Sequence, residues 1–101
     1  MTFSFVVFYS LMKMTAEKAD KAKEFWQEFS QKDWPEDLHI VGDYRFAWGT
    51  EWNGFLFLET DTPQLFFDFW PRFREKTRWY IDNTRTVIGI KRSPTEWLQD
   101  A

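Results

Sequence analysis

The chain has 101 residues, no cysteine and a formal net charge of −3. This length allows one domain with an ordinary hydrophobic core, and the absence of cysteine excludes disulfides, thiolate metal sites and cysteine nucleophiles. The 12 Phe, 7 Trp and 3 Tyr exceed what one small core takes, so we expect part of the aromatic surface to contact another molecule.

The first predicted element is a strand at residues 2–11, TFSFVVFYSL. Its two alternating sets of side chains are both apolar, which is typical of a central strand covered on both faces. The N-terminal segment has no basic lead and no cleavage site, and it is too short to span a bilayer. Together with the missing cysteine, this favours a cytoplasmic protein with no membrane partner.

A helix is predicted to follow, with Thr15 as its N-cap. Its apolar stripe comprises Ala19, Ala22, Phe25, Trp26 and Phe29. Two strands, at residues 38–48 and 51–60, are then predicted to form a hairpin around a tight turn at Gly49 and Thr50.

The segment FFDFWPRF, residues 66–73, belongs to a second predicted helix, which begins at Asp61 or Thr62. An apolar stripe along this helix is expected to form a wall of the core. Its members are Leu65, Phe66, Phe69, Trp70 and Phe73. Pro71 lies outside the stripe and should bend the helix. Phe67 shares the outer side with Pro71, so we expect a partner chain or the C-terminal tail to cover it.

A fourth strand is predicted most securely at residues 84–90. The SPTE motif that follows is a capping box. A short helical tail over residues 93–101 should therefore begin there and dock Trp97. We expect one domain over residues 1–92, followed by this tail.

The predicted element order, β-α-β-β-α-β, is typical of the ferredoxin-like class of α+β folds. Right-handed crossovers give a four-stranded antiparallel sheet of strand order 4-1-3-2, with both helices on one face. The other face is left bare although Phe55 and Phe57 point to one side of their strand, so we expect a further layer to cover that face.

Three stretches carry a family resemblance: PEDL at residues 35–38, GFLFLETDTPQLFFDFW at residues 54–70, and the basic, strand-forming close. With its E-T-D-x-P helix start at residues 59–63, the chain resembles a family of short prokaryotic proteins of unknown function. That family is similar to the dimeric α+β barrel superfamily, in which two ferredoxin-like sheets face each other. The resemblance implies a homodimer whose second copy covers the bare face.

We interpret the chain as a homodimeric binding or assembly module without a cofactor. The expected interface residues are Phe55, Phe57, Asp43, Arg45, Phe67 and Trp97. A small apolar or aromatic ligand is expected between sheet and helices. Its expected contacts are Trp26, Tyr44, Phe66 and Trp70. No carboxylate and histidine spacing indicates a metal site, and no glycine-rich loop indicates a phosphate site.

An enzymatic alternative stays open, because relatives in the superfamily include cofactor-independent oxygenases and haem-degrading enzymes. Strict alternation places His39, the one histidine, on the same strand face as Val41, Asp43 and Arg45. At the ordinary strand rise, His39 and Asp43 are about 13 Å apart, which is too far for a catalytic dyad. An Asp43 to Arg45 pair is expected to be structural or interfacial, and the residues leave catalysis undecided.

RNA binding is the alternative from another class, because RNA-recognition domains share this topology. Residues 54–57, GFLF, occupy the place of their aromatic strand motif. Asn53 replaces the basic residue of that motif, and the net charge of the chain is negative. Both observations argue against a nucleic-acid partner.

Overall fold

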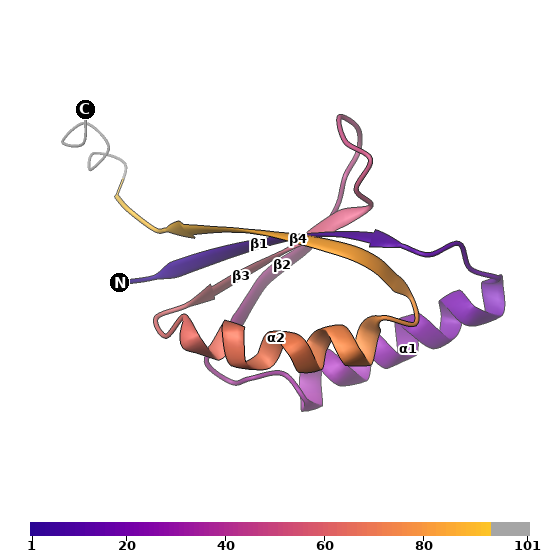
Figure 1. Cartoon of the computed structure of the whole chain (residues 1–101), viewed down its shortest axis with the longest axis horizontal. Coiled ribbons are helices and arrows are strands. Elements are labelled where there is room, and N and C mark those ends of the chain that lie inside the picture. The colour runs from indigo at the N-terminus through magenta and orange to yellow at the C-terminus, as the bar shows by residue number, and fades with distance from the viewer. Residues whose placement is uncertain (94–101) are drawn as a thin grey trace.

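The computed structural model describes residues 1–93, which form one βαββαβ unit (Figure 1). The elements are β1 (Phe3–Leu11), α1 (Ala16–Lys32), β2 (His39–Arg45), β3 (Gly54–Thr60), α2 (Gln64–Thr77) and β4 (Ile81–Ile90). The predicted element order is confirmed. The expected tail, with Trp97, lies outside the described residues.

The four strands form one antiparallel sheet in the order β2-β3-β1-β4, which is the predicted order read from the opposite edge. Figure 1 shows α1 and α2 together on one side of the sheet, which we call the helix face. The other side, the open face, carries neither helix. Strand β1 lies between β3 and β4. One set of its side chains points to the helix face, and the other set points to the open face.

The core lies between the helix face and the two helices, with Phe5 of β1 near its centre and fully buried. The Phe5 ring stacks on Phe66 of α2 with 4.2 Å between ring centroids. Farther along α2, Trp70 stacks on Phe73 at 4.5 Å. Such aromatic pairs contribute about 0.5–1.5 kcal/mol each beyond the area they bury. The FFDFWPRF segment is therefore mainly a wall of the core, as predicted.

Both helix starts follow from local side-chain chemistry. The Thr15 hydroxyl accepts a hydrogen bond from the Lys18 amide at 3.2 Å, which confirms the predicted N-cap of α1. Helix α2 begins at Gln64, slightly later than predicted, with Pro63 at the cap position. The Thr62 amide is already satisfied by the Thr60 hydroxyl at 3.0 Å, so residues 61 and 62 form a turn before the helix.

The β2–β3 connection differs from the predicted tight hairpin. Strand β2 ends at Arg45 and β3 begins only at Gly54, so the connection is a longer loop that projects away from the helices (Figure 1). The aromatic rings of the loop explain the difference. Phe46 and Trp52 lie outside the paired strands and pack on Phe8 of the open face, with 5.9 and 6.1 Å between ring centroids.

Two neighbouring phenylalanines of α2 provide a test of this core. Phe66 is 3% exposed and Phe67 is 50% exposed. We expect Phe66→Ala to lower the free energy of unfolding by about 3–5 kcal/mol, because it leaves a cavity against Phe5. Phe67→Ala, the matched control, should cost less than half as much. Urea denaturation followed by tryptophan fluorescence measures both, and equal losses would contradict the assignment of the buried stripe.

Candidate functional site

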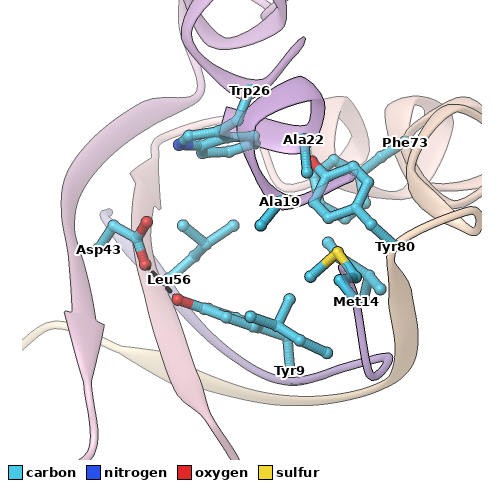
Figure 2. A pocket seen from close by; sticks show the side chains of 11 residues that line it. Tyr9, Met14, Ala19, Ala22, Trp26, Asp43, Leu56, Phe73 and Tyr80 are labelled. Atoms are coloured by element: carbon cyan, nitrogen blue, oxygen red, sulfur yellow. Dashed lines mark hydrogen bonds between the residues drawn. The ribbon is translucent and has the colours of Figure 1, made fainter. Parts of the chain in front are cut away.

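A pocket of about 260 Å³ lies between the helix face and the helices (Figure 2). It lies at the end of the sheet where β1 and β2 finish and where β3 and β4 begin. Its lining residues are Tyr9, Leu11, Met14, Ala19, Ala22, Trp26, Asp43, Leu56, Phe73, Tyr80 and Ile81. The surface of this pocket is almost entirely apolar. Its only charged side chain is that of Asp43.

A hydrogen bond crosses the floor of the pocket. The Tyr9 hydroxyl of β1 donates to Oδ1 of Asp43 on β2 at 2.8 Å, passing over the intervening strand β3. Gly54 of β3 is the register partner of Tyr9. A Cβ atom at Gly54 would clash with the backbone carbonyl oxygen of Tyr44 and would lie 2.6 Å from the Tyr9 hydroxyl oxygen. A glycine at this strand position therefore accommodates both the neighbouring backbone and the tyrosine that reaches across the strand.

A β-bulge brings Asp43 to this floor. The β2–β3 register shifts between Ile40 and Gly42, so Val41 is an extra residue in the ladder. Beyond the bulge, Asp43 pairs with Leu56 and therefore points to the helix face, whereas His39 pairs with Glu59 on the open face. The prediction that these residues share one face is wrong, because it assumed strict alternation.

The Asp43 carboxyl is electrostatically unfavourable in this position. Burial raises its pKa above the ordinary value, and the hydrogen bond from Tyr9 offsets only part of that effect. Within residues 1–93 no salt bridge involves Asp43, so the expected pairing with Arg45 is not formed there. Asp43 is nevertheless exposed to solvent at the pocket mouth, and its second oxygen remains available as an acceptor.

Tyr80 also lines the pocket, but its hydroxyl group is buried. The residue is 6% exposed, and its hydroxyl oxygen has no hydrogen-bond partner within the described chain. Burial, with a smaller contribution from the negative charge of Asp43, raises the pKa of Tyr80 to about 12. The hydroxyl therefore keeps its proton near neutral pH and remains a donor. A buried donor without an acceptor costs about 1–3 kcal/mol.

Loop contacts hold the pocket walls in place. Asn53 lies in the β2–β3 loop, and its side-chain oxygen accepts a hydrogen bond from the Leu11 backbone amide at 2.7 Å. The backbone amide of Asn53 donates to the Tyr9 carbonyl at 3.0 Å. The Met12 amide donates to the Tyr80 carbonyl at 3.0 Å. These bonds fix the end of β1 between the loop and the start of β4, so the two tyrosines are held by backbone contacts.

Of the four residues expected to contact a ligand, only Trp26 lines the pocket. Phe66 and Trp70 stack on each other at 4.8 Å within the core wall. Tyr44 lies on the open face, where it stacks on Phe55 at 4.8 Å. The sequence analysis did not assign Tyr9, Asp43 or Tyr80 to a pocket, and Gly54 within a strand was the available sign of a close approach at this end of the sheet.

The expected interface residues do not share one surface. Phe55 and Phe57 lie on the open face, while the register places Asp43 and Arg45 on the helix face. Phe67 is half exposed and its ring packs edge-on against Phe5 at 6.1 Å. Trp97 lies outside the described residues.

Residues 1–93 contain no group of three or more His, Cys, Asp or Glu side chains that could hold a metal ion. The pocket lining includes carboxyl, hydroxyl and thioether groups but no histidine. The chemistry available there is hydrogen bonding, charge pairing and apolar contact. In the same part of the chain, no helix is long and apolar enough to cross a membrane.

Comparison with known proteins shows a shared fold. No protein-family model and no curated protein sequence matches the chain. Among solved structures, a DABB family protein with a ferredoxin-like fold from Mesorhizobium loti is similar with a TM-score of 0.67 and 8% identity, over 91% of this chain and 98% of that one. The resemblance inferred from the sequence is therefore confirmed at the level of the fold.

Two further structures have the same architecture. A dimeric protein of unknown function from Bacteroides fragilis gives a TM-score of 0.59 at 12% identity, over 89% of this chain and 96% of that one. An uncharacterized NIPSNAP domain protein from Burkholderia xenovorans gives a TM-score of 0.60 at 15% identity, over 93% of this chain and 97% of that one. At these identities the likeness establishes the fold and leaves the chemistry to the residues of this chain.

The contribution of Asp43 to the free energy of unfolding should depend on pH. Because its folded-state pKa is raised, the folded protein binds a proton more tightly than the unfolded chain, and stability falls as pH rises from about 4 through the raised pKa. We expect Asp43→Asn to unfold at a higher urea concentration than the wild type at pH 7, with the difference shrinking towards pH 3.

The control for this experiment is Asp20→Asn, which removes the same charge from an exposed position of α1. It should not reproduce the gain. Lower stability of Asp43→Asn at pH 7 would mean that the carboxylate stabilises the fold, and would contradict this description of the site.

Proposed function

We propose that the chain is a homodimeric module that binds a small, largely apolar ligand in the pocket between the helix face and the helices. The observation that carries this proposal is the pocket itself, which combines apolar walls with a hydrogen-bonded carboxyl and hydroxyl pair, Asp43 and Tyr9, at one end. The cytoplasmic location remains part of the proposal and rests on the absence of cysteine.

Self-association is proposed from the open face. Val6, Phe8, Phe55 and Phe57 are part-buried there, and Val87 is 47% exposed. The loop rings cover Phe8 and Phe55, which leaves an apolar centre that no other layer of residues 1–93 covers. A second copy supplies a matching apolar surface, and the similar structure from Bacteroides fragilis is described as dimeric.

The alternatives have less support from the residues. Haem handling would require an iron ligand, yet no histidine lines the pocket and His39 belongs to the open face. Stacking of RNA bases would require free rings on β3. The ring of Phe55 instead packs against Tyr44 and Phe46, with 4.8 and 5.1 Å between ring centroids. Catalysis without a cofactor keeps one supporting observation, the raised pKa of Asp43 in a cleft.

Ligand binding is tested with 2-phenylethanol, a neutral aromatic probe of suitable size, by saturation-transfer NMR. We expect binding to the wild type and loss of binding in Ala19→Trp, because the indole would enter the pocket mouth. Ala16→Trp lies on the same helix but outside the lining and is the matched control. Equal signals from both variants would place the binding elsewhere and contradict the proposed pocket.

The dimer is tested by light scattering coupled to size exclusion. We expect a mass twice that of the 12.4 kDa chain at micromolar concentration. Val6→Glu, at the centre of the open face, should give a folded monomer, since a buried charge without a partner disfavours the interface. Gln27→Glu on the exposed side of α1 should remain dimeric. A monomeric wild type would overturn the assembly proposal.

A further inference from the structure

The pocket has two chemically different ends. Figure 2 shows the carboxyl of Asp43 and the hydroxyl of Tyr9 at one end of the cavity, with Trp26 and Tyr9 on opposite sides of it. Tyr80 and Met14 lie at the other end. The Tyr80 hydroxyl oxygen is itself buried, so a ligand that fills the cavity meets a negative charge at one end and apolar surface at the other.

The Asp43 end selects by charge. Oδ1 of Asp43 accepts from Tyr9, and Oδ2 retains the capacity to accept further hydrogen bonds. No lysine or arginine lines the pocket, so an anionic ligand would be repelled without compensation. A neutral ligand would gain one hydrogen bond at most. A cation would gain charge pairing with the carboxylate and contact with the faces of nearby aromatic rings.

On the basis of the proposed ligand-binding function, we propose that the ligand is a small organic amine whose ammonium group pairs with Asp43 between the rings of Trp26 and Tyr9. The volume of about 260 Å³ limits its size, since it lies just below the roughly 300–1,000 Å³ of drug-sized sites. A single aromatic ring on a short aminoalkyl chain has suitable dimensions. Its ring would lie against the apolar lining around Leu56 and Phe73.

Calorimetric titration of the full chain with three matched probes tests the charge preference. The probes are phenethylamine, 2-phenylethanol and phenylacetate, which share a ring and a short chain and differ in charge. We expect phenethylamine to bind at least tenfold more tightly than the alcohol, and phenylacetate not to bind. In Asp43→Asn the amine should lose this advantage while the alcohol still binds, whereas Asp20→Asn should behave as the wild type.

The outcomes separate this inference from the function on which it rests. Equal or tighter binding of 2-phenylethanol would overturn the amine inference and leave the apolar pocket as a binding site. An amine preference that survives Asp43→Asn would also overturn it. Failure of all of these probes to bind would remove both the inference and the proposed ligand-binding function.

Discussion

The hydrogen bond between Tyr9 and Asp43 is the contact on which the functional argument depends. It joins two strands that are not neighbours in the sheet, and it passes over β3 at Gly54, where a side chain would obstruct it. It also fixes the orientation of the Asp43 carboxyl at the mouth of an apolar pocket, where partial desolvation raises its pKa. A charged group held in one orientation beside an apolar cavity favours a role in recognition.

The two faces of the sheet differ in how their aromatic side chains are covered. On the helix face, most rings interlock tightly, as in the stack of Phe5, Phe66 and Trp70. The pocket lies near one end of the sheet, where the small side chains of Ala19 and Ala22 leave room beside Trp26. On the open face, part of the aromatic surface is covered by the chain's own loop, and the remainder is suited to a second copy. The high aromatic content thus has two uses, a rigid core and an exposed apolar surface.

Much of the fold could be predicted from the sequence because it depends on periodic patterns. The alternation in β1 and the apolar stripe of α2 each extend over several residues, so an error at one position does not alter the assignment. Thr15 as a cap and Phe66 as a core residue follow directly from such local rules. The strand order follows in turn from the element order and the handedness of the crossovers.

The site could not be predicted in the same way, because it depends on departures from periodicity. One extra residue at Val41 reverses the orientation of Asp43, and the sequence does not mark the bulge. Phe46 and Trp52 read as strand residues, although tertiary packing on Phe8 removes them from the ladder. The hydrogen bond from Tyr9 to Asp43 joins strands that are not neighbours, which only the three-dimensional arrangement reveals.

The central claim is that the Asp43 carboxyl is held in an environment that disfavours its charge until a ligand arrives. Its pKa can be measured directly in the free protein by following the side-chain carboxyl ¹³C resonance through a pH titration. The account predicts a midpoint above the value of about 3.9 that is ordinary for aspartate. A midpoint at or below that value would show a well-solvated or charge-paired carboxylate, and would contradict the account.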